Sequence, residues 1–168
     1  SSSYWRRILY ITYGIKTEGV YNFSVLPNAN DILTEMAKMN NYGFALMNIS
    51  KYSNDSKSGA NADYSLINQF LDDSNLTERN FIEEELVLLD PDIIITANLW
   101  SGKINNHELN KIFPENNFEY IKEITDKAIL FNLKVRNKKM RLIDLYHFSS
   151  RGSDKDLFYD PVMNLLFY

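Results

Sequence analysis

Hydrophobic residues in this chain recur mainly at a spacing of three or four positions, which is the period of an amphipathic helix. The first such segment places Trp5, Ile8, Leu9 and Ile11 on one stripe that ends near Gly14. Further helices are expected where the same spacing recurs, at residues 31–39, 64–71, 76–89, 105–113 and 161–166.

Residues that favour helix ends bound two of these segments. Asn30 or Asp31 is expected to cap the helix at 31–39. Asn75 followed by Glu78 resembles a capping box, and it predicts that the next helix begins there. That helix is expected to end before Pro91, because a proline disfavours helical geometry in the residue that precedes it.

Four short hydrophobic runs lack the helical spacing and predict buried strands. The clearest is 91–96, in which three consecutive isoleucines suit a strand that is buried on both faces. The others are residues 44–49, 128–133 and 140–146.

The order of these elements predicts a single α/β domain over residues 1–168. We expect a three-layer α/β/α domain with a short, mainly parallel central sheet. No strand precedes the first helix, which is unusual for such a domain, so we expect it to lack its N-terminal strand.

The composition excludes several kinds of covalent and metal-binding site. The chain has 168 residues, enough to bury one sizeable core, and it contains no cysteine. Disulfides, thiolate metal sites and cysteine-bound iron–sulfur clusters are thereby excluded, and we expect neither a metal nor another cofactor. No hydrophobic run approaches the ~20 residues needed to span a bilayer, and no signal peptide opens the chain. We therefore expect a cytoplasmic protein with no membrane partner.

The charge balance bears on nucleic-acid binding. The formal net charge is −4 and the isoelectric point is about 5.2. Proteins that bind duplex DNA tightly through many phosphates are usually basic, because counterion release drives that binding. Extensive, tight binding is therefore not expected, although a small basic face remains compatible with this charge.

The candidate functional side chains lie at the end of the last predicted strand, in the sequence MRLIDLYHFSSRG at 140–152. His147 is one of only two histidines, and Ser149, Ser150 and Arg151 follow it. In open α/β sheets, ligands bind outside the carboxyl ends of the strands. The alternative is that these polar residues only complete the hydrogen bonds of a strand end.

Four segments, taken together and in order, resemble the uracil-DNA glycosylase superfamily. The resemblance lies in SYWRRILY, YGFALMNISKYSN, NFIEEELVLLDPDIIITANLW and LIDLYHFSSRG. They correspond to a helix after the first motif, a strand that ends in asparagine, an acidic helix followed by a strand, and a histidine-serine motif at a strand end. The resemblance implies a single glycosylase-like domain that acts on DNA and removes uracil or a related damaged base.

By this resemblance, His147 would stabilise the departing base, Asn48 would recognise the base edge and Ser149 would contact the DNA backbone. Phe23, in the sequence NFSV, resembles a base-stacking phenylalanine in one branch, although core packing is the favoured interpretation for it. His107, the second histidine, is assigned no role.

The sequence also departs from the family pattern. The first motif, a glycine-rich turn whose Asp or Asn positions the attacking water, has no counterpart, so that residue is expected upstream of Ser1. Phe148 stands where proline is usual in the last motif. A non-catalytic module of the same fold, binding nucleic acid or a protein partner, is therefore the alternative. An unrelated small-molecule hydrolase is disfavoured, because no nucleophile elbow, phosphate loop or metal cluster is present.

Overall fold

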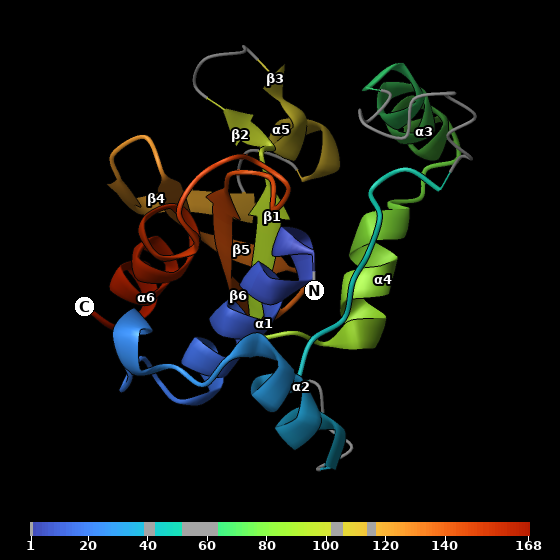
Figure 1. The fold of residues 1–168 in the computed structure, drawn as a ribbon. Helices are drawn as coiled ribbons and strands as arrows, with labels where there is room; N and C mark the ends of the chain where they lie inside the picture. Colours follow the sequence, from blue (N-terminus) through green and yellow to red (C-terminus); the bar gives the residue numbers. More distant parts are fainter. Residues whose placement is uncertain (1, 39–42, 52–63, 102–105, 114–116) are drawn as a thin grey trace.

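The protein forms an α/β fold in which helices surround a four-stranded mixed sheet (Figure 1). The computed structural model describes residues 2–38, 43–51, 64–101, 106–113 and 117–168. Its helical segments are α1 (Ser3–Lys16), η1 (Phe23–Val25), α2 (Ala29–Lys38), α3 (Tyr64–Leu76), α4 (Phe81–Leu89), α5 (Glu108–Ile112), the π-helical η3 (Lys155–Tyr159) and α6 (Asp160–Phe167). Its strands are β1 (Ile93–Ala97), β2 (Trp100–Ser101), β3 (Asn106–His107), β4 (Phe118–Ile124), β5 (Ala128–Val135) and β6 (Lys138–Leu145). The expected α/β class is confirmed.

The main sheet has the strand order β1-β6-β5-β4, and only the pairing of β1 with β6 is parallel. The pairings of β5 with β6 and of β4 with β5 are antiparallel. Two tight turns explain this, because strands joined by a short hairpin must run in opposite directions. A mainly parallel sheet is therefore not confirmed.

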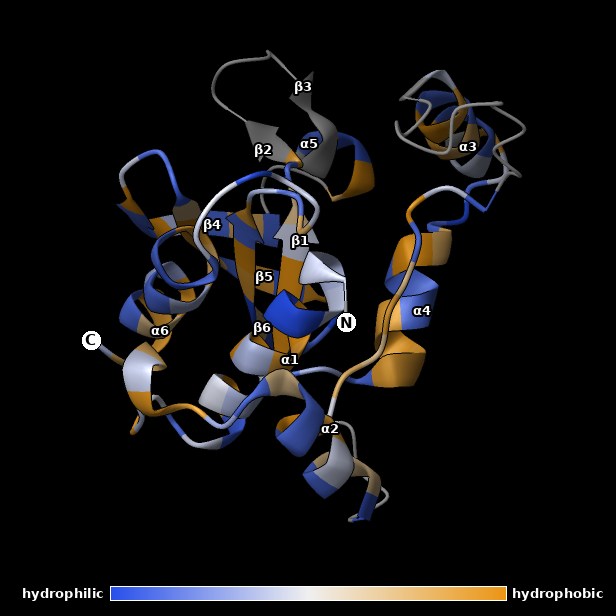
Figure 2. Cartoon of the chain, viewed as in Figure 1, coloured by the Kyte–Doolittle hydropathy of each residue, from blue (hydrophilic) through white to orange (hydrophobic). Residues whose placement is uncertain are grey.

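Two hydrophobic clusters meet the sheet. The first joins α1, η3 and α6 to side chains such as Leu130 of β5 and Ile143 of β6. The second joins α3, α4 and α5 to the alternate side chains, such as Phe131 of β5 and Leu142 of β6. Because successive side chains of a strand point to opposite faces, each cluster uses a different face of these strands. Figure 2 shows the hydrophobic residues concentrated on the central strands and along α4.

The structure contains a strand that the sequence did not predict. In β4, FEYIKEI, most side chains are exposed or half-buried, and β4 is an edge strand of the sheet. Glu119, Lys122 and Glu123 interrupt its hydrophobic residues, so the segment lacks the continuous hydrophobic run of a buried strand.

The strand predicted at residues 44–49 is wrong, because this segment has no regular secondary structure. It runs beside α4 in an extended path (Figure 1). A cavity that this segment and β1 both line separates it from the sheet, so its hydrophobic pattern has no strand to pair with.

Helix caps also differ from the prediction. Asn28 caps α2, and its side-chain oxygen accepts hydrogen bonds from the amides of Asn30 and Asp31, each at 3.1 Å. Asn80 rather than Asn75 caps α4, and it accepts from the amide of Glu83 at 2.9 Å. Asn75 lies inside α3, which continues to Leu76. The capping chemistry was identified correctly, but several nearby asparagines satisfy the same pattern.

Candidate functional site

The candidate site begins at His147, which follows β6 at the carboxyl end of that strand. His147 is exposed, and its carbonyl accepts a hydrogen bond from the amide of Ser150 at 2.8 Å, which closes a tight turn. The turn forms because the strand pairing ends at Leu145 and the polar residues then bond locally. The predicted location of His147, in a polar loop at a strand end, is confirmed.

Hydrogen bonds within the turn select one form of the His147 ring. The amide of Ser149 donates to Nδ1 at 3.2 Å, and Oγ of Ser149 lies 2.6 Å from the same nitrogen. A nitrogen that accepts from a backbone N–H carries no proton, so a neutral His147 carries its proton on Nε2. Nε2 of the neutral ring is thus a hydrogen-bond donor.

Arg7 of α1 holds this loop in place through hydrogen bonds to its backbone. Its side chain is 3% exposed, and its guanidinium donates to the carbonyls of Phe148, Ser150 and Gly152, the last two at 2.7 and 2.9 Å. It also donates to Oδ1 of Asp154 at 2.7 Å. The guanidinium donors therefore fix the carbonyls of three alternate loop residues and the carboxylate that follows them.

Asp154 balances the positive charge of that cluster. Burial by itself opposes ionisation of its carboxyl group, but hydrogen bonds from Arg6 and Arg7 outweigh burial and hold the pKa of Asp154 below its ordinary value. The same hydrogen bond raises the pKa of Arg6. The loop after His147 is thus held by hydrogen bonds that favour the charged forms of Asp154 and Arg6.

A buried carboxylate organises the neighbouring end of β1. Asp144 of β6 is 5% exposed, and its Oδ1 accepts from Oγ1 of Thr96 at 2.6 Å and from the amide of Leu99 at 2.9 Å. In addition, the amide of Asn98 donates to the carbonyl of Leu145 at 2.7 Å. The carboxyl ends of β1 and β6 are therefore fixed to each other directly beside His147.

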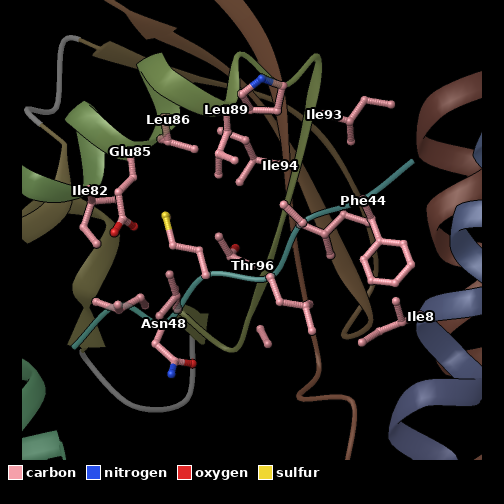
Figure 3. A pocket seen from close by; sticks show the side chains of 18 of the residues that line it. Ile8, Phe44, Asn48, Ile82, Glu85, Leu86, Leu89, Ile93, Ile94 and Thr96 are labelled. Atoms are coloured by element: carbon pink, nitrogen blue, oxygen red, sulfur yellow. The ribbon is translucent and has the colours of Figure 1, made fainter. Parts of the chain in front are cut away.

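A large cavity adjoins this corner of the sheet, with a volume of about 1570 Å³. Figure 3 shows it between β1, α4 and the extended segment that carries Asn48. His147 and Tyr4 also line it, and their rings lie 6.1 Å apart between centroids. Most of its lining is aliphatic, so the few polar groups at its rim would determine which ligand it accepts.

The structure brings two of the four predicted site residues to this cavity. His147 and Asn48 both line it, although no described contact joins them. Asn48 is exposed, and its carbonyl accepts from Nζ of Lys51 at 2.6 Å. Ser149 bonds to His147 but does not line the cavity.

Phe23 does not line the cavity either. Its ring packs edge-on against Tyr10 and Tyr159, at centroid distances of 5.2 and 5.6 Å. This is the core-packing arrangement that the sequence favoured for Phe23. The side chain of His107 lies outside the described side chains.

Sequence reasoning missed Arg7, Asp144 and Asp154, which hold the site in place. A signal existed for Arg7, which lies four residues before Ile11 and seven before Gly14, on the face of α1 that packs inward. The roles of Asp144, which is buried, and of Asp154, which is half-buried, depend on contacts distant in sequence, and no local pattern indicates them.

Two features were searched for and not found among the described residues. Nowhere in the described part of the chain do three or more His, Asp or Glu side chains gather as a metal site would require. Among the described helices, none is long and apolar enough to cross a membrane.

Comparison with known proteins found no matching family model, no matching curated protein and no matching solved structure.

Proposed function

We propose that this protein is a DNA glycosylase-like domain that removes uracil or a related damaged base by hydrolysis of the N-glycosidic bond. The observation that supports this proposal best is the state of His147. Its Nδ1 accepts from the amide of Ser149, so a neutral ring carries its proton on Nε2, and no hydrogen bond from Nε2 is found among the described residues. His147 and Asn48 both line the cavity. Asn48 and His147 have the roles expected from the resemblance to uracil-DNA glycosylases.

The chemistry fits these groups. When the bond between C1′ and the base breaks, its electron pair leaves with the base and positive charge develops on the sugar. A neutral imidazole that donates from Nε2 to a base oxygen stabilises that negative charge, as an oxyanion hole does. Water adds to C1′, and its released proton completes the departing base.

Asn48 and Ser149 would recognise the rest of the substrate. The amide of Asn48 offers both a donor and an acceptor, which suits the edge of a pyrimidine that has been flipped out of the helix. Ser149 is proposed to contact the DNA backbone, and its amide also keeps Nδ1 of His147 unprotonated. DNA is thus the proposed partner.

We also propose that the domain has the three-layer α/β/α arrangement expected from the sequence. The two hydrophobic clusters support it, because α1 and α6 contribute to one and α3, α4 and α5 contribute to the other.

Excision of uracil from a labelled single-stranded oligonucleotide tests the function. We expect His147→Ala to lower kcat by about 100- to 1000-fold, the usual loss when one donor to a developing oxyanion is removed. His107→Ala is the matched control, because it removes the other histidine and should leave kcat unchanged. Circular dichroism verifies that both variants fold. An uncut substrate with the native chain, or equal rates for the two variants, would contradict the proposal.

A non-catalytic module of the same fold is the second candidate, and the net charge of −4 with Phe148 in the loop favours it. Binding of the same oligonucleotide by fluorescence anisotropy separates the two. Binding that is weakened by Asn48→Ala, with no excision by the native chain, would support the module.

A further inference from the structure

One tryptophan in the first turn of α1 is unusually exposed. The hydrophobic spacing of the sequence places Trp5 on the same stripe as Ile8 and Ile11, and both isoleucines are buried in the cluster that meets the sheet. Trp5 itself is 46% exposed. Proteins bury most of the surface of their tryptophans on average, and indoles left at the surface are enriched at binding interfaces. The exposure of Trp5 therefore points to a ligand that covers it.

A chain of aromatic contacts holds Trp5 next to the candidate site. Its ring meets the ring of Tyr4 edge to face, with centroids 5.5 Å apart. Tyr4 in turn packs against Phe148 at 5.7 Å and lies 6.1 Å from His147. Trp5 and His147 are therefore separated by a single aromatic ring. Because Phe148 is buried and supports Tyr4, the indole is held in position before any ligand arrives.

The arginine that follows Trp5 supplies positive charge at the same place. The side chain of Arg6 is 39% exposed, and its Nε donates to Oδ2 of Asp154. Within the described residues, no hydrogen bond from its two terminal nitrogens is found. Asp154 also accepts from Arg7, so one carboxylate faces two guanidinium groups and an excess of positive charge remains. Arg6 can therefore bind a further anion through the donors that Asp154 leaves unused.

Arg151 adds a second exposed cation in the loop after His147. Arg7 fixes the backbone on both sides of it, through the carbonyls of Ser150 and Gly152 at 2.7 and 2.9 Å. The side chain of Arg151 is exposed, and no ion pair to it is found in the part of the chain that the structure describes. The loop is thus fixed while its cation stays in contact with solvent.

The charge of this region is opposite in sign to that of the whole chain. Residues 1–17 contain three basic side chains and no acidic one, whereas the chain has a net charge of −4. In η3, which follows the loop, Lys155 lies 3.6 Å from Asp160, so these two charges compensate each other. Asp156 is an exposed acid in the same segment, and it limits the size of the basic area. A small basic area in an acidic chain suits a short stretch of a polyanion.

An exposed indole beside arginines suits a single strand better than a duplex. Proteins bind single-stranded nucleic acid by stacking bases on aromatic side chains and by placing cations along the backbone. In a duplex each base is covered by its stacked neighbours, so an indole on the protein surface cannot reach a base face. Successive nucleotides of a stacked strand lie about 3.4 Å apart, so a few of them span the ring that separates Trp5 from His147.

We propose that Trp5, Arg6 and Arg151, beside His147, form a binding surface for single-stranded DNA, the Trp5 surface. One base stacks on Trp5, and Arg6 and Arg151 bind the phosphates next to it. The strand then continues past His147. The Trp5 surface rests on DNA being the partner in the proposed function, but binding to it does not require cleavage of the N-glycosidic bond.

The fluorescence of Trp5 tests the stacking. The chain has two tryptophans, Trp5 and Trp100, so a Trp100→Phe variant reports on Trp5 alone. Oligothymidylate is the probe, because it contains no uracil and stays intact. We expect saturating oligothymidylate to quench the emission of Trp5 by about half or more, and its duplex with oligoadenylate to need at least about a fivefold higher concentration for the same effect. The matched Trp5→Phe variant, which reports on Trp100, should show no change.

The affinity for labelled oligothymidylate, measured by fluorescence anisotropy, tests the contribution of the indole. We expect Trp5→Ala to raise the Kd by about 5- to 150-fold, which is the range for the loss of one stacked base. Tyr168→Ala is the matched control, because Tyr168 is a 77% exposed aromatic residue at the end of α6 and should leave the Kd unchanged. Circular dichroism verifies that both variants fold.

The salt dependence of the same binding tests the cation. We expect Arg151→Ala to reduce the salt slope by about 0.7, the value for one phosphate of a single strand. Arg136→Ala is the matched control, because Arg136 lies in the turn that precedes β6, whereas Arg151 follows the other end of that strand. It should leave both the affinity and the slope unchanged.

Three outcomes would overturn the proposal: unchanged emission of Trp5 with oligothymidylate, equal affinities of Trp5→Ala and Tyr168→Ala, or tighter binding of the duplex than of the single strand. An indole beside cations also suits an anionic membrane, so vesicles of phosphatidylcholine and phosphatidylglycerol are the competing probe. A blue shift of Trp5 emission on these vesicles, with no quenching by oligothymidylate, would overturn it as well.

Binding and excision separate this proposal from the proposed function. Binding of the single strand that depends on Trp5, with no excision of uracil, would support the Trp5 surface and contradict the glycosylase activity. Excision by a Trp5→Ala variant whose affinity for the single strand is unchanged would contradict the Trp5 surface alone.

Discussion

At the scale of single residues, one buried arginine determines the shape of the candidate loop. Arg7 contacts three carbonyls between Phe148 and Gly152, and its guanidinium also lies 4.0 Å from the centre of the Phe158 ring. A buried cation is tolerated only when its donors are satisfied, and Asp154 supplies the countercharge. The position of His147 therefore depends on a residue about 140 positions earlier in the chain.

Arg7→Lys should destabilise the fold, because a lysine ammonium cannot reach this set of acceptors with one planar fork. We expect the free energy of unfolding to fall by about 2–4 kcal/mol, measured by urea denaturation. The matched control is Arg6→Lys, which alters a half-exposed partner of the same Asp154 and should change stability by less than about 1 kcal/mol. Equal losses in the two variants would show that the carbonyl contacts of Arg7 contribute nothing.

Tyr159 predicts a change of stability at high pH. Burial raises the pKa of Tyr159 to about 12, and the charge of Asp160 adds to this shift. Its hydroxyl donates to the carbonyl of Tyr21 at 2.6 Å. The unfolded side chain ionises near pH 10, so the stabilisation is complete below pH 10 and is lost as the pH rises to 12.

Tyr159→Phe isolates this contribution because phenylalanine does not ionise. We expect the stability advantage of the native chain over the variant to shrink by about 2 kcal/mol between pH 10 and pH 12. Urea denaturation at several pH values measures it. A difference that stays constant with pH would contradict the assigned pKa.

At the scale of elements, the candidate site depends on the junction between β1 and β6. This is the only parallel pairing of the sheet, and it brings two strand ends from distant parts of the sequence to one edge. Asp144 then attaches the turn after β1 to β6 through Thr96 and Leu99. The cavity and the loop of His147 meet at this junction.

Asp144→Ala should loosen that junction, because the amide of Leu99 loses its buried acceptor. We expect a loss of about 2–4 kcal/mol in the free energy of unfolding. Thr96→Val removes only the hydroxyl partner and should lose about 1 kcal/mol. Denaturation of both variants and of the double variant gives the coupling between them. Additive losses would contradict a shared hydrogen-bond network.

At the scale of the whole molecule, the acidic charge balance restricts how the DNA of the proposed function could be bound. With a net charge of −4, only a small surface can neutralise phosphates. The exposed loop after His147 contains one such cation, Arg151.

Binding of a labelled uracil-containing duplex should therefore depend weakly on salt. We expect the logarithm of the binding constant to fall with the logarithm of salt concentration with a slope of about −2 to −4, which corresponds to a few phosphates. Arg151→Ala should reduce the slope by about 1. Fluorescence anisotropy at several salt concentrations measures both slopes, and a slope steeper than about −6 would contradict a small phosphate contact.

The sequence alone was sufficient for elements with a strong local pattern. The helix at α1, the strands β1, β5 and β6, and the polar loop that carries His147 follow from hydrophobic periodicity and turn residues. Burial of one side of a helix or strand sets the spacing of hydrophobic residues within a short segment, so the sequence of that segment is enough to detect it.

Tertiary structure decided every feature that depends on contacts with a segment distant in sequence. The run at 44–49 has the composition of a strand, but it is not one here because contacts with α1, α2 and α4 hold it away from β1. β4 is a strand despite its charges because β5 offers a free edge. The burial of Arg7, the tautomer of His147 and the unpaired edge of β1 arise from contacts between residues far apart in sequence, which no local pattern encodes.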